Sequence, residues 1–257
     1  MSNFSELLHP NASGFSISSG HALWRNVWVT ALGFAVYGFT AGVWRSPLMG
    51  GYVAVKMPLL IALTLGFNSL LNGLLGTLLG SRLGVLGSLN ALLGAFAISA
   101  LILGSLAPVL LFFIASAPAP DSASAGATHG LLLLAHTSLI AVAGLAGVLR
   151  LSQLLVAHAV SQGAARVTLV AWIAGNAFLG SQFAWILRPF FGSPTLEVAF
   201  LRPDPMRGSF YETIWKISLQ MVRGPESLIL PAMLLLCLLI GWSMHHNYQT
   251  NQTIKRP

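Results

Sequence analysis

Histidines and amides are the side chains that could do chemistry inside the long apolar stretches of this chain. His136 lies in such a stretch, His129 precedes it by seven residues on about the same helical face, and His158 follows further along. A neutral imidazole can ligate haem iron or the metal of a pigment. We expect instead a packed, hydrogen-bonded His136, because no other apolar stretch offers an evident histidine partner. His136 is thus a weak candidate metal ligand, and a haem- or pigment-binding membrane subunit is one alternative function.

Small and amide residues recur every four positions in an earlier apolar stretch, which places them on one slowly rotating stripe of a helix: Thr64, Asn68, Asn72 and Gly76. Such residues let membrane helices approach closely and hydrogen-bond across the contact. Asn176 and Gln182 in a later stretch allow the same reading. We expect helix packing at these positions. The alternative is that the amides line a polar path through a small transporter or channel.

Charged residues concentrate in residues 188–226, which hold five of the thirteen basic and four of the six acidic side chains. Prolines at 189, 194, 203 and 205 exclude a continuous helix through the first part of this segment, so we expect a stiff hook outside the membrane. The hook has phenylalanines that could anchor it and arginines that could hold an anionic headgroup. The residues predicted to dock a partner or lipid are Arg188, Phe190, Phe191, Arg202, Arg207 and Trp215.

The second part of the segment has the pattern of an amphipathic helix. Ser209 and Glu212 fit a capping box, in which serine caps the helix start and glutamate returns to the serine backbone. Apolar residues then share one face until Gly224-Pro225 ends the pattern. We predict that this helix lies in the membrane interface, either as an anchor alone or as part of the docking surface.

Signatures of enzymes and of proton-coupled transporters are missing from the sequence. No acidic residue lies well inside an apolar stretch, and neither paired catalytic carboxylates nor an HExxH, Walker or GxSxG motif occurs. We therefore expect a protein that is not an enzyme. No nucleic-acid partner is expected either, because the scattered positive charges suit bilayer topology and lipid phosphates.

The elements that must position these residues follow from composition. Of 257 residues, 55% are hydrophobic and 7% are charged, against about 25% charged in soluble domains. The sequence predicts an all-α, polytopic transmembrane bundle of about six spans, because a bilayer needs about 20 apolar residues per helix. The expected spans are 28–44, 58–79, 86–115, 131–149, 167–187 and 227–244, with Pro58 in a first helical turn and the fourth helix continuing past Arg150.

The predicted organisation has five parts: a polar N-terminal segment (1–27), a five-span bundle (28–187), the hook with its amphipathic helix (188–226), a last span (227–244) and a polar tail (245–257). If the first predicted span does not cross the membrane, five spans remain. The loop at 117–128 has no positive charge and is placed outside, but six basic residues then lie inside and seven outside, so orientation stays open.

Two stretches resemble a known family. Three short sequences resemble bacterial members of the Yip1-like multi-pass membrane family: Lys56-Met-Pro-Leu-Leu, Asn90-Ala-Leu-Leu-Gly94 and Gly104-Ser-Leu-Ala-Pro108. Residues 176–194 also look like uncharacterised bacterial multi-span proteins. The resemblance implies a bacterial inner-membrane protein with an organising or accessory role in a larger membrane assembly. Its expected partners are the lipid bilayer and other membrane subunits. No cofactor is expected; a bound phospholipid is the one alternative.

Overall fold

The computed structural model describes residues 20–78, 84–212 and 215. This part of the chain contains no strand, and its five long helices are α2 (Gly20–Val43), α3 (Pro47–Leu78), α4 (Val85–Ala115), α5 (Ala125–His158) and α6 (Gln162–Leu187). Each is long and apolar enough to cross a membrane. The chain is therefore all-helical in its described part and compatible with a multi-pass membrane protein.

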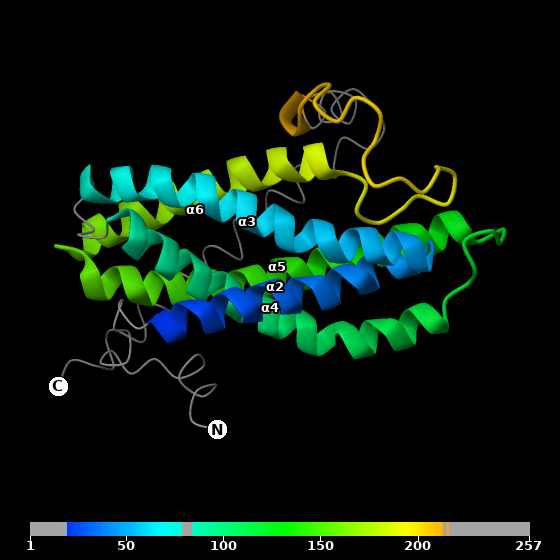
Figure 1. The fold of residues 1–257 in the computed structure, drawn as a ribbon, viewed down its shortest axis with the longest axis horizontal. Helices are drawn as coiled ribbons and strands as arrows, with labels where there is room; N and C mark the ends of the chain where they lie inside the picture. Colours follow the sequence, from blue (N-terminus) through cyan, green and yellow to red (C-terminus); the bar gives the residue numbers. More distant parts are fainter. Residues whose placement is uncertain (1–19, 79–83, 213–214, 216–257) are drawn as a thin grey trace, which may run out of the picture. The chain divides into compact units, whose positions relative to one another are not determined.

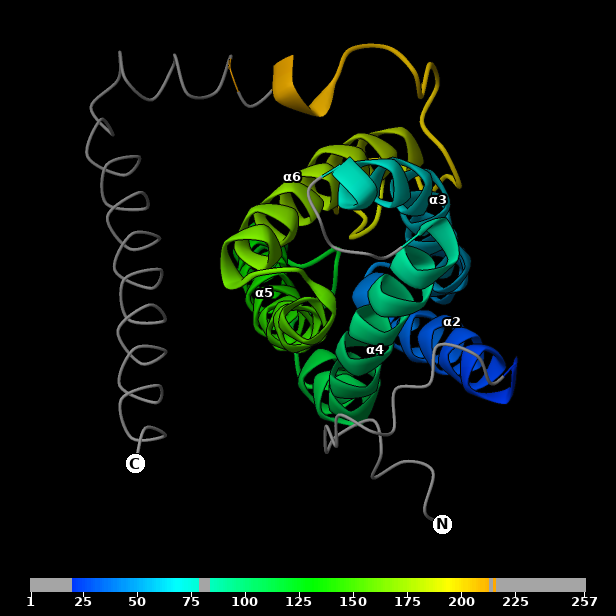
Figure 2. The same cartoon turned by 90° about the vertical axis from the view of Figure 1, so that its left-hand side faces the viewer.

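The five helices run up and down alongside one another (Figure 1). Seen from the end, they follow the circular order α2, α3, α6, α5, α4, and α3 also contacts α4 within the ring (Figure 2). The connection 44–46, the loop 116–124 and the start of the segment after α6 lie at the same end of the bundle (Figure 1). At that end the Trp44 indole Nε1 donates to the Pro118 carbonyl at 3.0 Å.

The start of α3 corrects one expectation. The helix begins at Pro47, whereas the sequence predicts Pro58 in its first turn. Ser46 caps this start, because its hydroxyl accepts the N–H of Met49 at 3.0 Å, and proline suits the first helical position. Pro58 lies inside the helix and removes one backbone hydrogen bond, which apolar membrane helices tolerate where neighbouring groups replace it.

The earlier start also moves Lys56 from a predicted connecting loop into a helix. Only residues 44–46 separate α2 from α3, and Lys56 is fully buried.

The remaining predicted spans agree better with the structure, since α4 matches 86–115 closely and α5 continues past Arg150 to His158. The last span, 227–244, lies outside the described residues.

Glycines let α2 lie very close to its neighbours. A Cβ added to Gly33 would stand 2.5 Å from the Ala100 carbonyl oxygen of α4. Cβ atoms added to Gly38 and Gly42 would each stand 2.6 Å from a carbonyl oxygen of α3. Real side chains cannot fit at these distances, so the GxxxG sequence Gly38–Gly42 is a helix contact, as is typical of this motif in membranes.

The chain divides into two compact units, residues 1–205 and 206–257. The first contains the five helices and the non-helical segment 188–205. In the second, the Ser209 hydroxyl accepts the N–H of Glu212 at 3.1 Å, which confirms the serine half of the predicted capping box. Beyond residue 212 the amphipathic helix is described only at Trp215.

Candidate functional site

Lys56 of α3 and the segment 188–205 meet in an unusual contact. The Lys56 ammonium donates to the Pro189 carbonyl at 2.8 Å, and it lies 4.9 Å from the centre of the Phe200 ring and 5.9 Å from that of Phe190. Among the described residues no carboxylate forms an ion pair with it. The lysine thus holds the segment through one carbonyl and two aromatic faces.

Arg45, just after α2, holds the same segment further along. Its Nε donates to the Ser193 carbonyl at 3.2 Å and its Nη2 to the Leu196 carbonyl at 3.3 Å. Gly192, with φ at +54°, lets the backbone turn there, and a Cβ on it would stand 2.9 Å from the Arg45 side chain. Two cations of the α2–α3 hairpin therefore fasten the main chain of residues 189–196, and we call this arrangement the carbonyl clamp.

Burying the Lys56 ammonium is unfavourable in free energy. Removing an ammonium from water costs several kcal/mol even after relaxation. A charge-assisted hydrogen bond returns about 1.5–3 kcal/mol, and a cation–π contact returns about 0.5–2 kcal/mol. These gains at best offset the cost, so a buried apolar residue would serve stability equally well. An ionisable side chain in such a helix is by default a functional-site hypothesis.

His136 lies beside the clamp and is 1% exposed. The Tyr37 hydroxyl donates to the His136 carbonyl at 3.2 Å and also forms a 2.9 Å hydrogen bond with the ring Nδ1, the donor of which depends on the tautomer of the ring. The ring Nε2 has no partner among the described residues. Phe191 packs on the same ring at 5.4 Å between centroids, so the prediction of a packed, hydrogen-bonded histidine is confirmed.

Polar side chains also gather between α3 and α6, which run antiparallel. A Cβ on Gly175 would stand 2.7 Å from the Asn68 amide oxygen, and one on Gly180 would stand 3.8 Å from the Thr64 side chain. Thr64 donates to the Leu60 carbonyl and Asn176 to the Trp172 carbonyl. Thr64 and Asn68 of the predicted stripe therefore face α6. Gln182 is half-buried, and the surroundings of Gly76 lie outside the described side chains.

Seven buried polar side-chain atoms of α3 and α6 have no hydrogen-bond partner among the described residues. They belong to two amides of α3 and three side chains of α6: Asn68, Asn72, Thr168, Trp172 and Asn176. One unsatisfied buried group costs about 1–3 kcal/mol, so seven would cost on the order of 10 kcal/mol, which approaches the whole stability of a typical protein. Water or a polar solute must therefore satisfy some of them.

The predicted docking residues fall into two groups. Phe190 and Phe191 pack against the hydrophobic core, so they attach the segment to the bundle. Arg202, Arg207 and Trp215 are exposed, the first in one unit and the other two in the second unit.

Arg188 has a defined position at the end of α6. Its guanidinium lies 3.7 Å from the Trp185 ring centre and donates to the Trp185 carbonyl at 2.6 Å. Partial burial, together with the positive charge of Arg202, lowers its pKa from the ordinary value. An anion beside both guanidinium groups would relieve this repulsion.

Sequence reasoning missed the most telling residues. Lys56 and Arg45 looked like ordinary loop charges, and Tyr37 was not singled out. The signal that could have revealed the error is Ser46-Pro47, a cap followed by a favoured first helical residue, which starts the helix before Lys56. Among the described residues no group of three His, Cys, Asp or Glu side chains is arranged to hold a metal ion.

Comparison with known proteins adds no relative to these observations. No protein-family model matches the chain, and neither a curated protein nor a solved structure shows significant similarity to it.

Proposed function

We propose that this chain is a non-enzymatic accessory or organising subunit of a larger membrane protein assembly in a bacterial inner membrane. The carbonyl clamp is the observation that carries the proposal. Lys56 and Arg45 bind main-chain carbonyls of residues 189–196, which makes the segment 188–205 a rigid surface. The exposed side chains of this segment, Arg202 among them, are thereby left to face a partner. The Yip1-like resemblance agrees with such a role and stays a prediction.

Arg188 and Arg202 are the proposed recognition residues on this surface. Partner subunits or lipid headgroups with carboxylate or phosphate groups would suit them, because a planar guanidinium binds both bidentately. Arg188 is already held on the Trp185 ring, so little side-chain entropy is lost when it binds. The exposed Arg202 supplies the second positive charge.

The test is native electrophoresis of the tagged chain, extracted from its own membrane with a mild detergent. The natural chain is expected in a complex much larger than its own 27.2 kDa. Arg188→Ala combined with Arg202→Ala should release it as a smaller species, while Arg166→Ala, at the opposite end of α6, should not. A complex of unchanged size in the double variant, or a natural chain that runs alone, would refute the proposal.

A second candidate function is a small transporter or channel with an amide-lined path between α3 and α6. The unsatisfied amides of Asn68 and Asn72 favour it, because they need water or a polar solute. In proteoliposomes, Asn72→Leu should slow the uptake of urea or glycerol at unchanged thermal stability, whereas Gln153→Leu on α5 should not. Unchanged uptake with a lowered melting temperature would assign these amides to packing.

A further inference from the structure

Two positive charges act on each other where α6 ends and the segment 188–205 begins (Figure 1). Arg188 directly follows α6, and partial burial together with the positive charge of Arg202 lowers its pKa. The same segment has two exposed carboxylates, Glu197 and Asp204, yet neither forms an ion pair with these arginines in the described structure. The repulsion between the two arginines is therefore left for an anion from outside the chain to neutralise.

The Arg188 guanidinium is held in place with one edge still available. It lies 3.7 Å from the centre of the Trp185 ring, and its Nη1 donates to the Trp185 carbonyl at 2.6 Å. The Nε and Nη2 groups form no hydrogen bond with any described residue. These two groups lie side by side along one edge of the planar guanidinium, so they can donate to two oxygens of the same phosphate.

The length and the exposure of α6 place this edge at the level of lipid headgroups. Its 26 residues make a helix of about 39 Å, whereas the hydrocarbon core of a bilayer is about 30 Å thick and the whole bilayer about 40–45 Å. Trp185, one turn before the end, is a residue type that prefers the membrane interface. Of the five described helices α6 is also the least covered, since 6% of its apolar stretch is buried, against 44% in α2. An arginine at its end is therefore beside lipid phosphates.

Before Arg188, the same side of α6 offers first an amide and then an apolar surface. Gln182 is half-buried, and its amide forms no hydrogen bond with any described residue. It precedes Arg188 by about 9 Å along the helix axis, and the ester groups of a phospholipid likewise lie deeper in the membrane than its phosphate. Phe178 is 56% exposed and shares the face of Trp185, because seven residues make nearly two helical turns. This face thus suits a phosphate, an ester and an acyl chain in turn.

We propose that this face of α6 binds an anionic glycerophospholipid of the phosphatidylglycerol type. Arg188 and Arg202 hold its phosphate, while Gln182 donates to an ester carbonyl and one acyl chain lies along Phe178. Phosphatidylcholine has the same phosphate but also a quaternary ammonium, which two neighbouring guanidinium groups repel. The inference rests on the recognition surface proposed above, and it makes the ligand of that surface a membrane lipid rather than a carboxylate of a partner protein.

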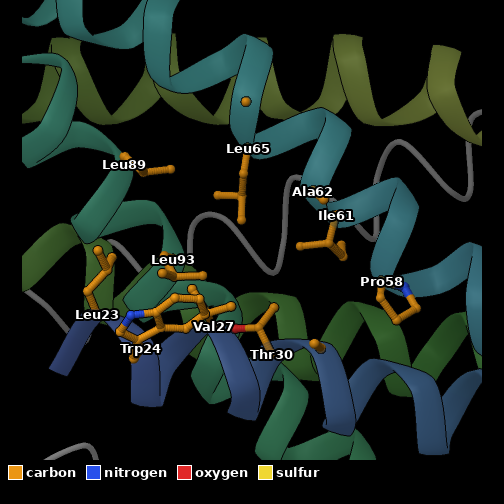
Figure 3. Close-up of a pocket in the computed structure, with 12 residues that line it drawn as sticks. Leu23, Trp24, Val27, Thr30, Pro58, Ile61, Ala62, Leu65, Leu89 and Leu93 are labelled. Atoms are coloured by element: carbon orange, nitrogen blue, oxygen red, sulfur yellow. The ribbon is translucent and has the colours of Figure 1, made fainter. Parts of the chain in front are cut away.

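A second apolar region of the bundle supplies an internal control. A pocket of about 420 Å³ lies between α2, α3 and α4, with Trp24, Ile61 and Leu93 in its wall (Figure 3). Among the described residues, no charged side chain lines it. Acyl chains that reach this wall should therefore do so equally well whatever headgroup they have.

Photo-crosslinking of the purified full chain in phosphatidylcholine nanodiscs tests the site. The two probes are phosphatidylglycerol and phosphatidylcholine with a diazirine in the same acyl chain, and labelled peptides are identified by mass spectrometry. Labelling of the second half of α6 should be about 10-fold stronger with phosphatidylglycerol, the effect of one charge-assisted hydrogen bond. Peptides of α2 and α4 that line the pocket should be labelled alike by both probes.

Variants assign the preference to individual side chains. Arg188→Gln and Arg202→Gln should each lower phosphatidylglycerol labelling of α6 about 3- to 10-fold, and Arg202→Glu should abolish the preference. Arg166→Gln removes the same charge at the opposite end of α6 and should leave this labelling unchanged. Gln182→Leu should weaken labelling by both probes equally, because both have the ester. Melting temperatures check that each variant is folded.

Three results would overturn the proposal. They are equal labelling of α6 by the two probes in the natural chain, a preference that survives in a folded chain with both arginines replaced, and loss of phosphatidylglycerol labelling when soluble inorganic phosphate is added. The last result would make the ligand a free anion.

The assembly role is tested separately, because the purified chain has no partner protein. If the double alanine variant loses the lipid preference but keeps the large complex on native electrophoresis, the lipid site stands and the assembly proposal fails. If that variant releases the complex while the natural chain is labelled alike by both probes, the arginines bind a partner protein and the lipid site fails.

Discussion

Replacing Lys56 with methionine should loosen the segment 188–205 without unfolding the bundle. Methionine has similar length and no charge, so it removes the hydrogen bond to Pro189 and both aromatic contacts and also the cost of a buried ammonium. Replacing a buried charge by a well-packed apolar group is often neutral for global stability. The melting temperature should therefore change little, while the segment loses its main attachment.

The size of the local effect follows from these contacts. A charge-assisted hydrogen bond contributes about 1.5–3 kcal/mol, and cation–π contacts contribute about 0.5–2 kcal/mol. Since such terms are not additive, a loss of about 2–3 kcal/mol is a reasonable expectation. At 1.4 kcal/mol for each tenfold change, the detached state should become about 30- to 150-fold more populated.

A cysteine-labelling assay measures that population. Val198 packs against the core from within the segment, so Val198→Cys reports detachment once the natural Cys237 is replaced by alanine. The maleimide labelling rate follows the open population when closing is fast. Adding Lys56→Met should raise this rate 30- to 150-fold, while Ser122→Cys in the loop 116–124, which is not part of the clamp, should label unchanged. An unchanged labelling rate at Val198→Cys would refute the clamp. An equal rise in the labelling rate of Ser122→Cys, together with a lowered melting temperature, would refute it as well.

Two further predictions concern the bundle itself. Gly33→Val should lower the free energy of unfolding by more than about 3 kcal/mol, because its Cβ would overlap the Ala100 carbonyl. Gly51→Val should be nearly neutral, because a Cβ there meets no atom within 4 Å. Thermal melts in detergent compare the two variants, and equal melting temperatures would contradict the α2–α4 contact. Tyr37→Phe should lower the free energy of unfolding by about 1–3 kcal/mol, because it leaves the buried Nδ1 of His136 unpaired. If adding His136→Phe cancels this loss, the two residues act as a pair. Additive losses in the double variant would show that they do not.

Sequence alone determined the helical, apolar character of this chain and the place of its non-helical segment. Long runs of apolar residues can bury their backbone polar groups in lipid only as helices, which explains why α4, α5 and α6 agree with the predicted spans. The prolines between 189 and 205 exclude a continuous helix there, whatever tertiary contacts the segment makes. The cap at Ser209 was equally local and equally predictable.

Only the tertiary structure decided which side chains meet inside the bundle. Lipid and protein interior are both apolar, so these helices carry no strong amphipathic stripe that tells the inward face from the outward one. The pairing of Tyr37 with His136 joins residues 99 positions apart, and that of Lys56 with Pro189 joins residues 133 apart. Neither helical spacing nor composition reports such contacts, because they depend on the circular order of the helices.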